Sequence, residues 1–308
     1  MGTPDFAVPS LEAVHGLGYD VVGVFTQPDR PAGRGKKLTA CPVKQRALEL
    51  GLDVYQFEKV KTPEGVARLR ALAPDVMITA AFGQILTREI LEIPVHGTVN
   101  VHASLLPKYR GSAPINWCIL QGETETGVTL MLTDVGIDTG DILASRTTPI
   151  DDMETAGELT VRLSRLGAEL LRDALPEYLA GNIQPVKQDE SRASYEPMLQ
   201  KAMGEIDWQR PAKAIARQVQ GLNPWPGAYT EMPGGTLKIH RARAVADETD
   251  AVPGTVTASG PKCGLVVKCG EGALEVVELQ APGGRRMEAR AYLAGKRIDE
   301  GTRFGKDL

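Results

Sequence analysis

Short apolar runs alternate with amphipathic stretches through the first half of the chain, and this alternation restricts the fold more than any other feature. The apolar runs predict β-strands, and the stretches between them repeat apolar residues with helical spacing. Strands that alternate with helices form an open parallel sheet with helices on its faces, so we expect an α/β fold. The predicted strands are residues 20–25, 75–80, 98–101 and 127–132, and the predicted helices are residues 9–17, 42–51, 62–72 and 113–121.

The pattern changes in the second half of the chain. Apolar residues from Leu159 to Ala174 recur at spacings of three and four, which predicts a long helix over 155–180 that closes the first domain. From Ala228 onward, brief β-rich runs separated by Pro-Gly or Gly-Gly predict a small β-domain such as a barrel. A chain of 308 residues is long enough for both. We expect a first domain over residues 1–182, a linker over 183–207 and a second domain over 208–308.

Several classes of protein are disfavoured by composition. No apolar run approaches ~18 uninterrupted residues, and the N-terminus lacks the basic-then-apolar layout of a secretory signal, so we expect a cytoplasmic protein without a membrane partner. The cysteines form no Cys-x-x-Cys pair and have no histidine at ligand spacing, which argues against a zinc site and a disulfide scaffold. These cysteines are Cys41, Cys118, Cys263 and Cys269.

The charge is unevenly divided. The whole chain carries 35 Lys and Arg against 39 Asp and Glu, a formal net charge of -4. Residues 200–308 hold 16 of these cations and 13 of these acids, which leaves 19 and 26 for residues 1–199. The mildly basic last third indicates either a polyanionic partner or ordinary variation of the surface.

Asn100 and His102 form the densest cluster of polar groups in an apolar setting. If the strand predicted over 98–101 continues to His102, the two-residue period places both side chains on one face, at a strand end where open α/β sheets bind ligands. An amide can donate to a developing oxyanion and an imidazole can carry a proton, a combination that suits acyl transfer. An isolated pair of this kind can also be a satisfied polar pair without a reaction.

A turn with three acids follows the strand predicted at 127–132. Gly136 and Gly140 allow a tight turn, and Asp134, Asp138 and Asp141 all lie on it. A carboxylate beside an imidazole can fix its tautomer and stabilise its charged form. The spacing does not decide which of the three acids meets His102.

Residues 27–37 form a second unusual stretch, a loop rich in Pro and Gly that carries Arg30, Arg34, Lys36 and Lys37. Such a loop suits contacts with phosphate groups, although it can also be a solvated charged loop. It matches neither the nucleotide P-loop nor a dinucleotide fingerprint. The absence of Gly-x-Gly-x-x-Gly disfavours a nicotinamide dehydrogenase.

Together these motifs resemble the methionyl-tRNA formyltransferase family, within the wider group of formyltetrahydrofolate-dependent transformylases. The resemblance covers almost the whole chain and keeps the family's order. The Asn-x-His-x-Ser-Leu-Leu-Pro and Asp-Thr-Gly motifs are shared across the transformylases, while the basic loop, the Asn-Pro-Trp-Pro motif and the β-rich tail are what resemble the tRNA-specific members. The segments that carry the resemblance are residues 2–6, 27–37, 100–107, 136–140 and 223–226.

The resemblance implies a Rossmann-type N-terminal catalytic domain, an OB-like C-terminal tRNA-binding domain, and a reaction. The formyl group of 10-formyltetrahydrofolate, a cosubstrate, would pass to the α-amino group of methionine on initiator methionyl-tRNA. The enzyme would be a monomer and would need no metal. The resemblance also selects Asp138 among the three acids. It implies Asn100, His102 and Asp138 as catalytic residues, Ser104, Leu105, Leu106 and Pro107 as the lining of the folate site, and Arg30, Arg34, Lys36 and Lys37 as contacts with tRNA.

One departure from the family concerns the sheet. Family members have a β-strand directly before the Gly-Thr-Pro-Asp-Phe motif, and here only Met1 precedes that motif. In a doubly wound sheet this strand is central, so without it neighbouring strands lose a ladder partner. We therefore expect a Rossmann-type sheet without its first strand.

Two other functions remain open at this point. A transformylase or formyl hydrolase that acts on a small molecule, such as an amino sugar nucleotide, would keep Asn100, His102 and Asp138 but has less need of the basic loop. A noncatalytic RNA-binding protein on a transformylase core is disfavoured, because all three positions hold residues competent for the chemistry.

Overall fold

The computed structural model describes residues 1–32 and 37–305 and separates the chain into two compact units. Neither unit is a single stretch of sequence, because two short segments that precede residue 160 belong with the C-terminal part. The first unit comprises Met1–Pro114, Glu125–Thr148 and Thr160–Glu196, and the second comprises Ile115–Thr124, Pro149–Leu159 and Pro197–Leu308.

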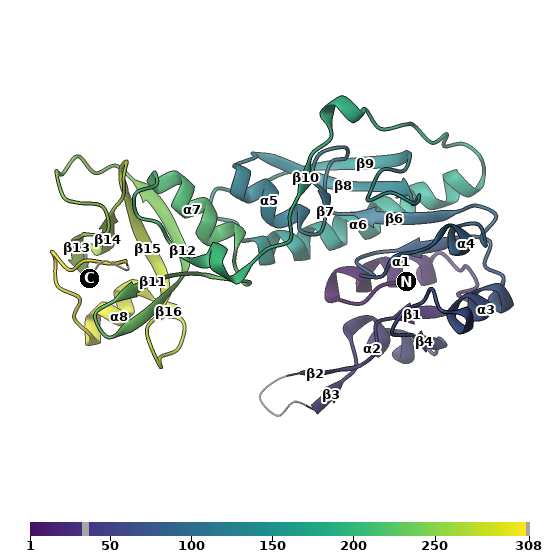
Figure 1. The fold of residues 1–308 in the computed structure, drawn as a ribbon, viewed down its shortest axis with the longest axis horizontal. Helices are drawn as coiled ribbons and strands as arrows, with labels where there is room; N and C mark the ends of the chain where they lie inside the picture. The colour runs from purple at the N-terminus through teal and green to yellow at the C-terminus, as the bar shows by residue number, and fades with distance from the viewer. Residues whose placement is uncertain (33–36, 306–308) are drawn as a thin grey trace. The chain divides into compact units, whose positions relative to one another are not determined.

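The first unit contains the strands of the predicted α/β fold, divided between a sheet of two strands and a sheet of four (Figure 1). Parallel pairs join β1 (Val24–Thr26) to β4 (Val54–Gln56) and β5 (Met77–Thr79) to β6 (Thr98–His102). On its other side β6 pairs with β8 (Glu125–Leu132), followed by β9 (Ile142–Pro149). The predicted fold class is confirmed with one correction, because β8 runs antiparallel to β6. Antiparallel strands at the edge of a largely parallel sheet are common in α/β proteins.

Four helices begin and end close to the predicted residues: α1 (Val8–Gly16), α2 (Pro42–Glu49), α3 (Pro63–Leu72) and α6 (Ala156–Leu179). In α3, Pro63 occupies the first turn and the Thr62 hydroxyl accepts a hydrogen bond from Gly65 N, an arrangement that starts a helix efficiently. In α6, Gly167 allows close packing on the sheet, since a Cβ there would lie 2.7 Å from Val101 Cγ1 of β6. A further short helix, α4 (Arg88–Leu91), was not predicted from the sequence.

A cavity of about 420 Å³ lies between β1 and β5, where the resemblance implied a further strand. At its end Met1 and Gly2 connect the two strands: Gly2 N donates to Phe25 O, and Ala80 N donates to Met1 O. The strand predicted over 20–25 is in the ladder only from Val24, because residues 21–23 line this cavity. Residues from 75 to 78 line its opposite side.

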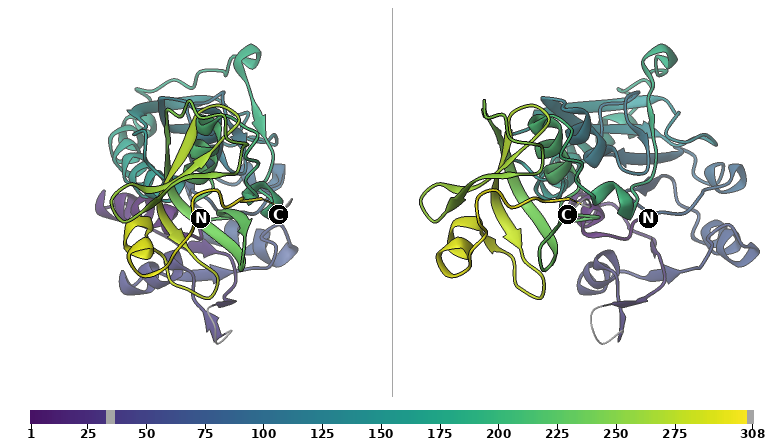
Figure 2. Two further views of the ribbon diagram at one scale, coloured as in Figure 1. Left: turned by 90° about the vertical axis from the view of Figure 1, so that its left-hand side faces the viewer. Right: turned by 60° about the vertical axis from the view of Figure 1, so that its left-hand side comes forward.

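The second unit is built on an antiparallel sheet, as predicted for the C-terminal part (Figure 2). Its order is β11 (Ala228–Met232), β12 (Gly235–Val245), β15 (Ala273–Gln280), β14 (Gly264–Lys268) and β13 (Val256–Gly260), and β16 (Met287–Glu288) pairs with β15. Two helices, α7 (Ala212–Gly221) and α8 (Ala289–Gly295), accompany these strands. Ile215 and Val219 of α7 are completely buried in one core with Leu237, Leu265 and Leu274 of the sheet.

The described part of the chain carries neither a membrane-spanning helix nor a disulfide. No helix there is long and apolar enough to cross a membrane. All four cysteines are free thiols, with Cys118 and Cys269 buried. Burial raises the pKa of the Cys269 thiol to about 12, so this sulfur is a packing group rather than a nucleophile. Within residues 1–32 and 37–305, no group of three His, Cys, Asp or Glu side chains could hold a metal ion.

Candidate active site

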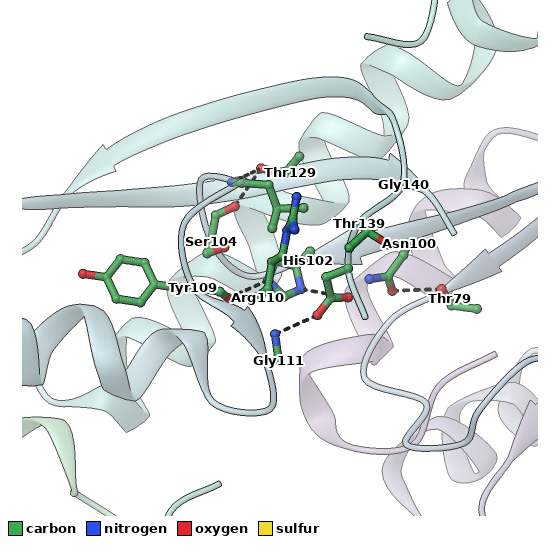
Figure 3. Close-up of polar contacts among 12 residues, drawn as sticks. Thr79, Asn100, His102, Ser104, Tyr109, Arg110, Gly111, Thr129, Thr139 and Gly140 are labelled. Carbon is green, nitrogen blue, oxygen red and sulfur yellow. Dashed lines mark hydrogen bonds and ion pairs between the residues drawn. The ribbon is translucent and has the colours of Figure 1, made fainter. Parts of the chain in front are cut away.

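Strand β6 extends to His102, so Asn100 and His102 share one face of the sheet, as the two-residue period requires (Figure 3). On the neighbouring strand β5, the Thr79 hydroxyl donates a hydrogen bond of 2.8 Å to Asn100 Oδ1. Because the amide oxygen faces Thr79, the amide nitrogen of Asn100 faces the other way. It is therefore available as a donor to a ligand at the end of the strand.

His102 is almost fully buried, and both of its ring nitrogens face oxygen atoms. Nε2 lies 3.1 Å from Tyr109 O, and since a carbonyl can only accept, Nε2 carries the proton in this contact. Nδ1 lies 3.6 Å from Asp138 Oδ1. That separation is too long for a hydrogen bond, so Asp138 acts on His102 as a nearby charge.

The turn after β8 separates the three candidate acids. Both carboxylate oxygens of Asp134 accept from the Thr139 hydroxyl, and Oδ1 also accepts from Gly136 N, so this acid holds the turn together. The turn comes so close to β8 that a Cβ on Gly140 would lie 1.6 Å from the carbonyl oxygen of Leu132. At Asp141 it is the backbone that is engaged, since its carbonyl accepts from Leu132 N.

Asp138 is the acid that meets His102. Its backbone has φ of 54°, in the left-handed region that residues other than glycine rarely adopt. One carboxylate oxygen faces His102 and the other accepts a hydrogen bond of 2.9 Å from Gly111 N. The geometry thus brings together the three residues that the resemblance implied, from β6 and from a turn 36 residues further along the chain.

The segment expected to line the folate site, Ser104 to Pro107, leads directly out of the end of β6. Ser104 is completely buried, and its hydroxyl donates to Lys108 O at 2.8 Å. Thr129 of β8 donates to Ser104 O and accepts from Leu106 N, which fixes the loop on the sheet. Leu106 is buried too, whereas Leu105 and Pro107 are partly exposed. Leu105 and Pro107 are therefore the members of this segment that can contact a ligand directly.

Arg110 was not singled out from the sequence, yet it is the largest fully buried side chain of the site. Each of its five N–H groups has an acceptor. Two donate to the side-chain oxygen Oε1 of Gln188, two to the Glu190 carboxylate and one to the Tyr195 hydroxyl. Hydrogen bonds to Glu190 raise the pKa of Arg110 despite its burial, so it stays charged.

Gln188, Glu190 and Tyr195 all lie in the predicted linker. Part of that segment therefore packs against the site: β10 (Tyr195–Glu196) pairs in parallel with β7 (Arg110–Gly111). In the sequence, residues 187–192 are a run of polar residues. Such a run is expected both for a solvated loop and for a segment that binds a buried cation, so it does not indicate the contact with Arg110.

The two described ends of the basic loop are β2 (Arg30–Ala32) and β3 (Lys37–Thr39). These strands pair as an antiparallel hairpin that projects from the first unit (Figure 1). Lys37 is exposed, and Arg30 forms an exposed ion pair of 2.6 Å with Glu58. Such surface pairs contribute only about 0–1 kcal/mol, so Arg30 can exchange Glu58 for a phosphate. Arg34 and Lys36 lie outside the described residues.

The base of this hairpin is fixed by a small polar network. The Lys44 ammonium and the Gln56 amide both donate to the Asp29 carboxylate and lower the pKa of Asp29. Lys44 also donates to the side-chain oxygen Oε1 of Gln56, so each of the three side chains is hydrogen-bonded to the other two, and Asp29 directly precedes Arg30 in the chain. The network fixes where the loop leaves the sheet.

Comparison with known families matches both parts of the chain. A family described as "Formyl transferase" matches residues 1–175, and one described as "Formyl transferase, C-terminal domain" matches residues 198–297. The methionyl-tRNA formyltransferase of Trichlorobacter lovleyi is 52% identical over 302 residues, which are 98% of this chain and 95% of that protein. That of Geobacter sulfurreducens is 50% identical over 306 residues, 99% of this chain and 96% of the relative.

Solved structures share the fold at low sequence identity. The sugar 3N-formyl transferase WlaRD has a TM-score of 0.64 at 20% identity and covers 89% of this chain and 94% of its own. HypX from Aquifex aeolicus in complex with tetrahydrofolic acid has a TM-score of 0.58 at 20% identity, over 82% of this chain and 46% of that one. At this level of identity the likeness concerns the fold alone.

Proposed function

The chain belongs to the formyl transferase family, and we propose that it transfers the formyl group of 10-formyltetrahydrofolate to the α-amino group of methionine on initiator methionyl-tRNA. The observation that carries this proposal is the identity of about half of all residues, over nearly the whole length of both chains, with methionyl-tRNA formyltransferases. The sugar-directed alternative has weaker support, because the sugar formyltransferase WlaRD is only 20% identical.

In the proposed reaction the neutral amine attacks the formyl carbon, and a new C–N bond forms as the carbonyl electrons move onto oxygen. The Asn100 amide nitrogen, which Thr79 directs away from itself, donates to this oxyanion. His102 in its protonated form donates from Nδ1, the ring nitrogen that has no short hydrogen bond in the protein. Asp138 stabilises the imidazolium charge and, directly or through a water, accepts the proton that the attacking amine loses.

The tetrahedral intermediate then collapses. The bond between the formyl carbon and N10 of the folate breaks, and N10 takes up one proton, so that the amine's proton reappears on tetrahydrofolate and the products balance. The folate would lie over residues 104–107, with Leu105 and Pro107 in contact and buried Ser104 holding the loop in shape. No step requires a metal ion.

The acceptor end of the tRNA would lie against the basic hairpin. Arg30 and Lys37 are exposed there, and Arg34 and Lys36 continue the same run of cations in the sequence. The excess of three positive charges in residues 200–308 adds to the attraction for a polyanion. We expect the enzyme to act as a monomer in the cytoplasm, where translation supplies its substrate.

The experiment that tests the proposal is a formyl-transfer assay with methionyl initiator tRNA and, in parallel, an amino sugar nucleotide. We expect the tRNA to be formylated, and Asn100→Ala to lower kcat by about 10²–10³, the usual cost of removing one oxyanion donor. Asn182→Ala is the matched control, because Asn182 is an exposed asparagine that donates only to Glu177. Formylation of the sugar nucleotide alone would refute the acceptor, and near-normal turnover of Asn100→Ala would remove Asn100 from the mechanism.

A further inference from the structure

Gln188 makes the only described side-chain hydrogen bonds to the backbone of the Asp138 turn from outside that turn. Its amide nitrogen donates 2.9 Å to Asp138 O and 2.7 Å to Gly140 O. One carbonyl belongs to Asp138, the residue with the left-handed backbone, and the other to Gly140, two residues later in the turn. A conformation that a side chain rarely adopts by itself persists only where surrounding contacts determine it.

The orientation of Gln188 is in turn fixed by Arg110. Two N–H groups of the guanidinium donate to Gln188 Oε1, at 3.1 Å and 2.8 Å. An amide has its acceptor at one end and its donors at the other, so an acceptor end facing Arg110 must place the NH₂ group on the turn. Arg110 is itself fully buried and charged, and it therefore cannot release Gln188 without leaving two of its N–H groups without an acceptor.

The same segment reaches Asp138 and His102 by a second route. Gly111, next to Arg110, donates its N–H to the Asp138 carboxylate, and Tyr109, on the other side, accepts from His102 Nε2. This strand is held by the segment that carries Gln188, since Arg110 N donates to Ser194 O and Tyr109 N to the Ser194 hydroxyl. Backbone and side chain of Asp138 are thus both positioned from residues 109–111 and 188–195.

We infer that Gln188 is a positioning residue for catalysis, which sets the distance and direction of the Asp138 carboxylate relative to His102 through its two hydrogen bonds to the turn. Gln188 touches neither reactant and acts only through Asp138. The inference rests on the proposed function, because it assigns Gln188 a role only if Asp138 takes part in the reaction.

Gln188→Glu is the variant that isolates this role. A glutamate has the same shape and still accepts from Arg110, but it has no hydrogen to donate to Asp138 O or Gly140 O. We expect kcat to fall on the order of 10-fold to 100-fold, the usual cost of misplacing a catalytic group by a fraction of an ångström to an ångström, with KM for both substrates within about twofold of its original value. Gln184→Glu is the matched control, since Gln184 makes a similar amide-to-carbonyl bond in the same segment, to Gly181 O at 3.2 Å on the surface.

A double-mutant cycle with Asp138→Asn distinguishes positioning from a general structural role. If Gln188 acts through Asp138, then Gln188→Glu should change kcat of the Asp138→Asn enzyme by less than about twofold. Equal losses in both backgrounds would overturn the inference, and so would an unchanged kcat of Gln188→Glu in the original chain. If Asp138→Asn itself remains fully active, the proposed role of Asp138 fails, and the inference falls with it for that separate reason.

The unfolding midpoints of all variants are measured alongside. If Gln188→Glu folds poorly, Gln188→Met removes the same two donors without adding a charge. It also removes the oxygen that accepts from Arg110, so only the dependence of its effect on Asp138, read from kcat in the two backgrounds, tests the inference. A loss of kcat by Gln188→Met that Asp138→Asn does not suppress would equally refute the inference.

Discussion

At the scale of single residues, one hydroxyl decides which way the Asn100 amide faces. Thr79 is buried on β5 and donates to Asn100 Oδ1, so the amide nitrogen is left for a ligand. Without that hydroxyl the amide loses the hydrogen bond that fixes its orientation, and in the reversed orientation an oxygen rather than a donor would face the developing oxyanion. Preorganised donors are effective because they need no reorientation during the reaction.

Thr79→Val removes the hydroxyl and keeps the shape of the side chain. We expect kcat to fall by about tenfold, less than the ~10²–10³ expected for Asn100→Ala, since the donor is still present but no longer held. Thr79→Ser keeps the hydroxyl and should retain most of the activity. Steady-state kinetics of the two variants checks this, and equal kcat values for valine and serine at position 79 would show that the hydroxyl does not orient Asn100.

The sequence alone could place Asn100 and His102 together, because strand periodicity relates residues two apart. It could not choose among Asp134, Asp138 and Asp141, because that choice depends on which carboxylate the turn itself uses. In the structure Asp134 is occupied by Thr139 and Gly136, and this leaves Asp138 for His102. Arg110 and Gln188 were missed because they lie 78 residues apart in the chain, and because Gln188 is 48 and 50 residues from the two carbonyls that it binds.

At the scale of elements, the cavity of about 420 Å³ lies between the facing edges of β1 and β5, and Met1 is among the residues that line it. The Met1 amine donates to Ile78 O at 2.6 Å, and burial lowers the pKa of this amine from 8.0 to about 5. Apolar side chains, among them Leu11, Leu72 and Leu175, line most of the cavity. The cavity therefore combines open strand edges with an apolar lining, the two features that an additional strand requires.

The buried amine makes the stability of the 308-residue chain depend on pH. Between pH 5 and 8 the unfolded chain binds more protons than the folded chain, so the free energy of unfolding rises with pH across this window. The difference between 8.0 and about 5 corresponds to about 4 kcal/mol over the full window.

A strand-forming extension of about five alternating valine and isoleucine residues, joined to Met1, should enter the cavity. The amine becomes a neutral amide N–H that donates to Ile78 O without carrying a charge. We expect a higher unfolding midpoint and the loss of most of the pH dependence between 5 and 8, measured by thermal unfolding at several pH values. A Gly-Ser extension of equal length also removes the charge but cannot fill the cavity, so equal midpoints for the two extensions would contradict docking of a strand.

Helices were easier to predict than strands, and this cavity shows why. A helix satisfies its own backbone, so α1, α2, α3 and α6 begin within two residues of the positions predicted from their periodicity. A strand needs neighbours, and the run over 20–25 enters a ladder only at Val24, where residues 54–56 lie beside it. The antiparallel direction of β8 was not predictable either, because direction depends on the path of the chain between strands.

At the scale of the whole molecule, the chain order of segments differs from their grouping into units. Helix α5 (Pro114–Gln121) lies between β6 and β8 in sequence, yet from Ile115 onward it belongs with the C-terminal unit. Asn116 Nδ2 donates to Gly221 O at the end of α7, and a Cβ on Gly221 would lie 2.9 Å from Leu120 Cγ. A linear reading of the sequence assigns α5 to the first domain, because periodicity shows that a helix is present but not what it packs against.

A C-terminal fragment that starts at residue 197 should therefore hold α7 less firmly than the intact chain does. The fragment lacks Asn116 and Leu120, and it also lacks Asp152, whose carbonyl accepts from the Gln220 amide at 3.0 Å. Each lost hydrogen bond contributes a net of about 0.5–1.5 kcal/mol, and the packing of Leu120 is lost as well, so amide hydrogen exchange in α7 should be at least about tenfold faster in the fragment. Asn116→Ala in the intact chain should reproduce part of this increase, whereas the exposed change Asn182→Ala should not. Equal protection of α7 in fragment and intact chain would mean that residues 197–308 fold without the two inserted segments, and that their packing against α7 contributes nothing to the stability of the C-terminal unit.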